Sequence, residues 1–274
     1  MADLPLHAEL GDLGTVCRLG LASRGNTTLG VEDVLEAVRR GVNYLNWCGY
    51  TDGMSEAVRS LGEKRGDVII ATQLSARSGV AARKELQEKL AQLGTDAIDI
   101  VTYYYLEHES EWEEVQAAGG AHEVLEEAKA RGVVRAIGLT SHQRRLAARI
   151  AVSGRIDLLM IRYNAAHRGA EEEVFPLVLK KKTPIVTFTG MRWGALIRTT
   201  ADDPPGFVPP LPLDCYRFVL SHPSVTVGLM APEGRQELEE DLRLLDDWRG
   251  LTEAEDEILR AHGDRVRRHA GSFP

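Results

Sequence analysis

Side chains that could take part in chemistry occur directly after short apolar runs of the sequence. Tyr50 follows the run VNYLNWC (42–48), and its hydroxyl could donate a proton or a hydrogen bond to a ligand. A phenol has a pKa of about 10, so proton donation near neutral pH benefits from an adjacent cation. Glu107 follows the run IDIVTYYYL (98–106) and could act as a general base. The alternative role for Tyr50 is that of a loop tyrosine with no part in chemistry.

The three cysteines favour neither a disulfide framework nor a metal site. Cys17, Cys48 and Cys215 lie far apart in the sequence and form no CxxC motif. Cys48 has no histidine or basic residue beside it that would activate its thiol as a nucleophile. We therefore expect reduced thiols and no metal centre.

The elements that must position these side chains follow a regular alternation of apolar runs and segments with helical spacing. Near-continuous apolar runs of this kind fit parallel strands that are buried on both faces. The eight predicted strands are CRLGLA (17–22), VNYLNWC (42–48), VIIATQ (68–73), IDIVTYYYL (98–106), VVRAIGLTS (133–141), DLLMIRYN (157–164), PIVTFTG (184–190) and SVTVGLM (224–230).

The segments between these runs predict crossover helices. Apolar residues within 31–38, for example, recur on one helical face. Eight strand–helix units with no point at which the strand order would reverse predict an α/β fold, a single (β/α)8 TIM barrel domain over residues 1–274. Thr252 and Glu255 form a capping box that opens an additional C-terminal helix. The proline-rich segment 199–212 is expected to arch over one end of the barrel.

In such a barrel the active end is formed by the C-terminal ends of the strands and the loops after them. Trp47, Trp193 and Glu107 fall at this end and are predicted to line a pocket. Alternate residues of a strand face opposite sides, so at most two of the tyrosines in 103–105 can point inward. Tyr104 is the one that we expect in the pocket.

The segment GVNYLNWCGYTDGMSE (41–56) resembles that of the aldo-keto reductase family in which a strand ends in Asp, a catalytic Tyr follows, and Ser-Glu opens a helix. Further matching segments, among them IGLTSH and SHPSVTVGLMAPEGRQELEEDL, follow the family's order along nearly the whole chain. The resemblance implies an NADP(H)-dependent oxidoreductase that acts on a carbonyl or an alcohol.

The resemblance also implies a substituted catalytic site. In the family a Tyr donates the proton, a Lys paired with an Asp enhances its acidity, and a His orients the substrate. Tyr50 matches the Tyr, whereas Asn46 stands in place of the Asp, Gln73 of the Lys and Tyr104 of the His. The step from Asn46 to Tyr50 is one residue shorter than usual, which implies a rearranged loop. Asn and Gln form a neutral pair that can exchange hydrogen bonds, so the site is expected to be neutralised.

At the nicotinamide end of the implied cofactor site, Tyr163 would supply the aromatic ring on which nicotinamide stacks. Ser141 and Met160 replace the Asn and Gln that hold the carboxamide in the family. We therefore expect NADP to be held less firmly, or no cofactor at all.

The adenosine end of the implied cofactor site also departs from the family. Glu237 and Asp241 replace a Gln and an Asn there. The added carboxylates would repel a 2′-phosphate, although Arg235 could partly compensate.

The overall charge and hydropathy restrict the class of partner. The 33 basic and 41 acidic residues give a net charge of −8, and neither sign forms a long block, so nucleic acid is not expected. No apolar stretch approaches the roughly 20 residues of a membrane helix, and the N-terminus lacks a basic region followed by an apolar core. The expectation is a cytoplasmic protein that binds a small molecule.

Three functions remain open from the sequence. The first is an oxidoreductase whose ordinary activity is weak, altered or absent. The second is a catalytically silent barrel that binds a ligand or a protein. The third is a lyase or isomerase without redox chemistry that uses Tyr50, Tyr104 and Glu107.

Overall fold

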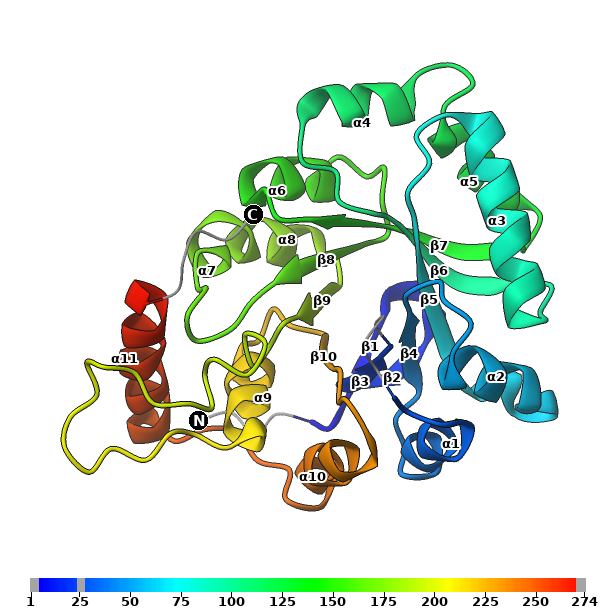
Figure 1. Ribbon diagram of the computed structural model, residues 1–274. Coiled ribbons are helices and arrows are strands. Elements are labelled where there is room, and N and C mark those ends of the chain that lie inside the picture. The colour runs from blue at the N-terminus through cyan, green and yellow to red at the C-terminus, as the bar shows by residue number, and fades with distance from the viewer. Residues whose placement is uncertain (1–4, 24–27, 270–274) are drawn as a thin grey trace.

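The computed structural model describes residues 5–23 and 28–269, and its eight central strands form a closed parallel barrel (Figure 1). The barrel order is β10-β3-β4-β5-β6-β7-β8-β9. The strands are β3 (Leu19–Ala22), β4 (Tyr44–Trp47), β5 (Ile69–Leu74), β6 (Ile98–Tyr103), β7 (Val134–Ser141), β8 (Leu158–Arg162), β9 (Ile185–Phe188) and β10 (Val227–Met230). Each overlaps one predicted run, so the predicted (β/α)8 fold is confirmed.

Helices surround the barrel (Figure 1). They are α1 (Val31–Arg39), α2 (Gly53–Ser60), α3 (Gly79–Leu93), α4 (Glu109–Gln116), α5 (Ala121–Ala130), α6 (Arg144–Val152), α7 (Ala170–Glu173), α8 (Phe175–Lys181), α9 (Pro212–Ser221), α10 (Arg235–Asp246) and α11 (Glu253–His269), with short 3-10 turns at Gly11–Leu13 and Gly62–Asp67. No helix among the residues 5–23 and 28–269 is long and apolar enough to cross a membrane.

A hairpin that the sequence analysis did not predict closes the N-terminal end of the barrel. Strand β1 (His7–Glu9) pairs antiparallel with β2 (Thr15–Cys17). Leu10 and Val16, in and beside the hairpin turn, pack with Tyr44 and Ile69 in the barrel interior. The opposite end, at the carboxyl ends of the strands, is the one left for a ligand.

Alternation along the strands separates two apolar cores. One fills the barrel interior and includes Ala71 and Met160, and the other lies between the strands and the helices and includes Leu45 and Ile161. Residues two positions apart on a strand face the same side. A residue near the end of a strand can therefore reach the cavity only if the residue two positions before it lies in the barrel interior.

The C-terminal helix α11 begins as predicted, because Thr252 Oγ1 accepts a hydrogen bond from the Glu255 N–H at 3.2 Å and Glu255 Oε2 accepts one from the Thr252 N–H at 2.8 Å. The proline-rich segment 199–212 does not arch over the barrel end as expected. It packs along α11, where the Phe207 ring lies 4.8 Å from that of His262. Ion pairs from Asp202 and Asp203 to α11 fix it there.

Candidate active site

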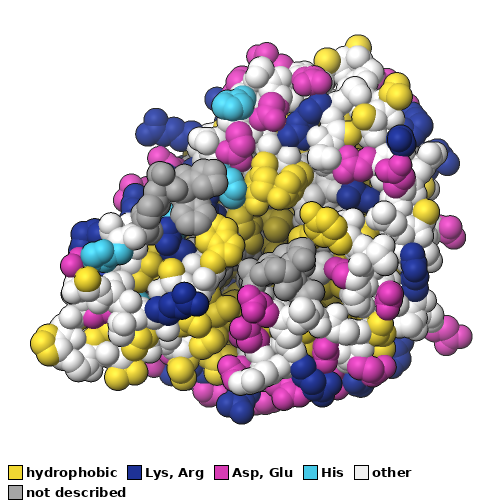
Figure 2. Space-filling model, in the orientation of Figure 1, with side chains coloured by type: hydrophobic (Ala, Val, Ile, Leu, Met, Phe, Trp, Pro, Cys, Tyr) yellow, Lys and Arg dark blue, Asp and Glu magenta, His cyan; other side chains and the backbone are white. Residues whose placement is uncertain are grey.

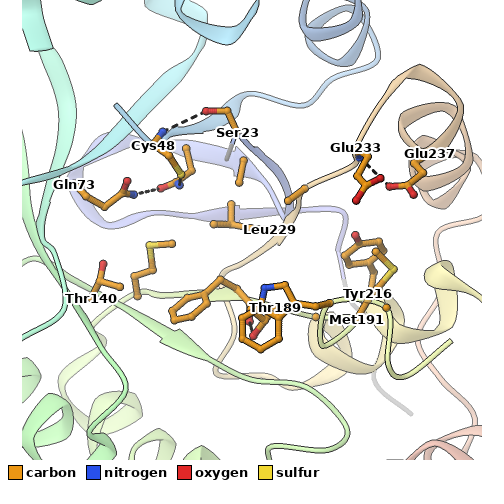
Figure 3. A pocket seen from close by; sticks show the side chains of 18 of the residues that line it. Ser23, Cys48, Gln73, Thr140, Thr189, Met191, Tyr216, Leu229, Glu233 and Glu237 are labelled. Atoms are coloured by element: carbon orange, nitrogen blue, oxygen red, sulfur yellow. Dashed lines mark hydrogen bonds between the residues drawn. The ribbon is translucent and has the colours of Figure 1, made fainter. Parts of the chain in front are cut away.

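A cavity of about 520 Å³ opens at the carboxyl ends of the barrel strands. Figure 2 shows hydrophobic side chains gathered around a hollow near the centre of the face. The deep part is lined by strand residues, among them Asn46, Gln73 and Met160, and an arm continues between the segments that follow β9 and β10. Figure 3 shows Gln73 and Cys48 at one end of this cavity and Glu233 and Glu237 at the other.

Asn46 and Gln73 form a hydrogen-bonded pair in the deep part of the cavity. Gln73 Nε2 donates to Asn46 Oδ1 at 2.9 Å, and the two residues are 8% and 2% exposed. β4 and β5 bring them together because Asn46 is paired in register with Ala71, two positions before Gln73. Both side chains are uncharged, so the pair satisfies buried polar atoms without placing a cation or a carboxylate in the cavity.

Tyr50 does not join this pair. Its side chain is 61% exposed, and it is not among the described residues that line the cavity. Gly49 has a φ of +88°, which turns the chain after β4. The Trp47 indole then donates from Nε1 to the Tyr50 carbonyl at 2.6 Å. The shortened loop therefore holds the Tyr50 backbone against β4 and leaves its ring at the surface.

Trp47 lies elsewhere than expected. It is fully buried in the core between the strands and the helices and does not line the cavity. Trp47 follows the inward-facing Asn46 directly, so strand alternation points its ring outward. Trp193, by contrast, does line the cavity and remains half exposed at its rim.

Two of the three consecutive tyrosines reach the cavity, and Tyr105 does so only because the chain leaves strand conformation after β6. Tyr103 is buried toward the helices and its hydroxyl lies 2.9 Å from His122 Nδ1. Tyr104 and Tyr105 line the cavity with ring centroids 4.0 Å apart. Tyr105 has a φ of 40°, a conformation that is strained for a non-glycine residue and often found at functional sites. Burial raises the pKa of the Tyr105 hydroxyl, which therefore stays protonated near neutral pH.

Glu107 lies outside the described lining of the cavity. Its Oε1 accepts a hydrogen bond from the His142 N–H at 2.8 Å, and its own N–H donates to Glu111 Oε2 at 2.7 Å. The carboxylate thus ties the loop after β6 to the end of β7. Glu107 was expected to line the pocket but does not. It lies four residues beyond the end of β6, so the loop and not the strand sets the direction of its side chain.

The expected nicotinamide-binding residues are only partly brought together. Met160 lines the cavity, whereas Ser141 is fully buried and accepts a hydrogen bond from the Gln143 N–H at 3.0 Å. Tyr163 is 1% exposed and lies in the core between strands and helices. Its hydroxyl donates to Glu171 at 2.6 Å, so the ring is not available to a ligand in the cavity.

Phe188 is the aromatic residue that the strand ends do present beside Met160, and the sequence analysis missed it. It is the last residue of β9, lines the cavity and packs against the barrel-interior core. Thr140, at the end of β7, lines the same region. The signal that could have found Phe188 is its even spacing from the inward-facing Val186.

The segment after β9 forms one wall of the arm. Thr189, Arg192 and Trp193 have φ values of 59°, 52° and 50°, and Gly194 follows with 78°. Tight turns of this kind can form anion-binding nests from backbone N–H groups, although the Arg192 N–H is already bonded to the Thr189 carbonyl at 2.9 Å. Of the described residues that line the cavity, Arg198 is the one that carries a positive charge.

The far end of the arm is acidic. Glu233 and Glu237 line it, and Glu237 Oε2 accepts a hydrogen bond from the Glu233 N–H at 2.8 Å (Figure 3). Arg235, which was expected to compensate the charges of Glu237 and Asp241, instead pairs with Glu239 at 2.8 Å and with Asp33 at 3.2 Å. It does not line the cavity.

A buried carboxyl lies behind this acidic end. Asp241 is 2% exposed, and the Tyr216 hydroxyl donates to its Oδ2 at 3.2 Å. Burial, helped by the charges of Glu237 and Glu240, outweighs the opposing effect of the Tyr216 hydrogen bond and raises the pKa of Asp241 to about 7. Tyr216 itself lines the cavity. Asp241 is therefore connected to the cavity through one phenol.

No group of three or more His, Cys, Asp or Glu side chains within the described ranges could hold a metal ion. The described part of the cavity offers neutral hydrogen-bonding groups, aromatic rings, the positive charge of Arg198 and one acidic end.

Comparison with known proteins identifies the family. The model of the aldo/keto reductase family matches residues 26–209. The NADH-specific methylglyoxal reductase of Escherichia coli is 27% identical over 208 residues, which are 64% of this chain and 61% of that protein. This chain thus spans less than two thirds of that relative's length in the match.

Solved structures show the same fold. The aldo-keto reductase AKR11C1 from Bacillus halodurans, in its holo form, has a TM-score of 0.74 at 20% identity and covers 95% of both chains. An aldo-keto reductase from Klebsiella pneumoniae in complex with NADPH also has a TM-score of 0.74, at 16% identity over 96% of both chains.

Proposed function

The chain belongs to the aldo/keto reductase family, and from this premise we propose that it binds a nicotinamide dinucleotide in the cavity at the barrel mouth, whereas carbonyl reduction assisted by Tyr50 is weak or absent. The proposal combines the oxidoreductase and the silent-barrel hypotheses of the sequence analysis.

The shape and lining of the cavity support dinucleotide binding. Nicotinamide would lie in the deep part against Phe188, Met160 and Thr140, and the rest of the molecule would follow the arm. Arg198 and the backbone N–H groups of the segment after β9 would face the pyrophosphate. When bound in reduced form, the dinucleotide would supply a hydride.

The hydrogen bond between Gln73 and Asn46 carries the second half of the proposal. A Tyr acts as proton donor near neutral pH when a neighbouring cation lowers its pKa. Gln73 supplies no charge, and the Tyr50 ring lies at the surface. Loss of a charged assistant costs about 10² to 10⁴ in rate for general acid catalysis. Tyr104 and Tyr105 remain in the cavity and can orient a ligand through their hydroxyl groups.

The printed name of the E. coli relative, which includes NADH and methylglyoxal, supports a nicotinamide cofactor and a small carbonyl compound as ligands. A lyase or isomerase is disfavoured, because Glu107, the general base that it would use, bonds the His142 N–H outside the described cavity lining. We also propose that residues 1–274 fold as one domain, since β10 closes the barrel against β3.

Equilibrium titration with NADH and with NAD⁺ tests the proposal, followed by calorimetry and by intrinsic tryptophan fluorescence, to which Trp193 at the cavity rim contributes. We expect binding that Phe188→Ala weakens by about fivefold, because an aromatic contact is worth about 1 kcal/mol. Tyr50→Phe is the matched control at the surface and should bind as the wild type does. Absence of binding at millimolar dinucleotide would contradict the proposal.

A further inference from the structure

We propose that the acidic end of the arm selects against a phosphate on the adenosine ribose, so that the protein binds NADH and NAD⁺ in preference to NADPH and NADP⁺. The inference rests on the proposed function and deepens it. It departs from the NADP(H) that the family resemblance implies, and it is carried by Glu233, Glu237 and the pairing of Arg235.

The cavity fixes which end of a dinucleotide meets these carboxylates. A nicotinamide ring that reaches Phe188 and Met160 occupies the deep part, and the arm then leads past Arg198 to Glu233 and Glu237 (Figure 3). A dinucleotide that follows this path with its pyrophosphate near Arg198 brings its adenosine ribose toward the two glutamates. The phosphate that distinguishes NADPH from NADH is attached to that ribose.

The N-terminus of α10 would ordinarily favour such a phosphate, because its first backbone N–H groups carry a partial positive charge. Here Glu237, in the first turn of the helix, supplies a negative charge at that end. Its carboxylate also accepts the Glu233 N–H just before the helix. The protein's own anion therefore occupies the position that a phosphate would use.

Among the residues that the structure describes, Arg235 at the start of α10 is paired with other carboxylates. Arg235 Nε lies 2.8 Å from Glu239 and its Nη1 lies 3.2 Å from Asp33, and the residue does not line the cavity. A phosphate monoester carries about −1.5 to −2 charges at pH 7. Placing it beside Glu233 and Glu237 brings like charges together, whereas a ribose with free hydroxyl groups can donate hydrogen bonds to the same carboxylates.

Isothermal titration calorimetry with NAD⁺ and NADP⁺ at low ionic strength tests the inference without relying on turnover. We expect NAD⁺ to bind at least tenfold more tightly than NADP⁺, and the ratio to fall as salt screens the repulsion. Glu233→Gln combined with Glu237→Gln should tighten NADP⁺ binding at least tenfold and leave NAD⁺ binding equal or weaker. Glu240→Gln, which removes the same charge from α10 outside the cavity lining, should preserve the wild-type ratio.

ADP-ribose and its 2′-phosphate derivative repeat the comparison for the arm alone. Equal or tighter binding of NADP⁺ by the wild type, or a ratio that the double substitution leaves unchanged, would overturn the selectivity while leaving the proposed function intact. Failure of both dinucleotides to bind would overturn the proposed function, and the selectivity with it.

Discussion

Gln73 Nε2 donates a hydrogen bond to Asn46 Oδ1 across 2.9 Å in the deep part of the barrel mouth. The relationship follows from parallel pairing of β4 with β5, which places two amide side chains side by side among apolar residues. The Gln73 amide supplies the donor and the Asn46 carbonyl the acceptor, so this part of the cavity is polar and uncharged.

The hydrogen bond between Gln73 and Asn46 predicts that charged substitutions at the two positions affect stability in a coupled way. Gln73→Lys alone would place an uncompensated cation beside Asn46, and Asn46→Asp alone would leave an unpaired carboxylate. Each should lower the free energy of unfolding by about 3 kcal/mol. The double variant should lose less than the sum, with a coupling energy of about 1–3 kcal/mol measured by urea denaturation in a double-mutant cycle. Strict additivity would show that the two side chains do not interact as described.

The raised pKa of Asp241 predicts that the free energy of unfolding falls as the pH rises. Its pKa is raised by burial to about 7 from 3.8, so the folded protein holds a proton that the unfolded chain has released. The stabilisation is fully present below about pH 4 and is lost as the pH rises through about 7. Asp241→Asn should therefore gain stability relative to the wild type as the pH rises from 4 to 8, by up to about 4 kcal/mol.

Thermal unfolding of both proteins across this pH range provides the measurement. Tyr216→Phe removes the hydroxyl that bonds Asp241 Oδ2 and should raise the midpoint of the titration further. If the difference in stability between Asp241→Asn and the wild type does not change with pH, the raised pKa of Asp241 is contradicted.

The lowered pKa of Asp203, in the proline-rich segment, predicts the opposite pH dependence of stability. Burial acts to raise its pKa, but hydrogen bonds from the Thr200 N–H and from Arg265 outweigh it and lower the pKa to about 2. Its stabilisation is present above about pH 4, its unfolded range, and is lost as the pH falls through about 2. Asp203→Asn should destabilise by about 2 kcal/mol at pH 7.

The effect should be local to the proline-rich segment, because Asp203 joins it to α11 through Arg265 and His262. Hydrogen exchange should show faster opening of the segment 199–211 and of α11, with the barrel strands unchanged. The exposed Asp202→Asn is the matched control and should have a smaller effect. Equal destabilisation by both substitutions would contradict this account.

The strands could be predicted from the sequence because each is an apolar run buried on both faces, and that pattern is independent of neighbouring loops. The neutral pair could be predicted too, because the family resemblance aligns Asn46 and Gln73 with an Asp and a Lys that pair with each other. The β1–β2 hairpin was missed because its strands have only three residues each, too few to show a period.

The remaining site residues depend on features that the sequence pattern does not fix. Trp47 at the end of β4 and Tyr163 just after β8 both point outward, so each ring lies in the core between the strands and the helices instead of in the cavity. The position of Tyr50 depends on the turn at Gly49 and on the Trp47 indole bond, which belong to a loop. Phe188 was not predicted, because the sequence analysis assigned the ring that stacks on nicotinamide to Tyr163, just after β8, and not to the aromatic residue at the end of β9.

Hydride transfer from NADH tests the central claim most directly, namely that the cavity holds the dinucleotide without a charged proton-donating site at Tyr50. The loss of NADH absorbance with a panel of aldehydes, ketones and dicarbonyls, methylglyoxal included, should be followed for the wild type and for Tyr50→Phe. We predict turnover at least 10²-fold below the roughly 10 s⁻¹ of a typical enzyme, and the same rate in both proteins. Turnover near 10 s⁻¹ that Tyr50→Phe abolishes would contradict the account.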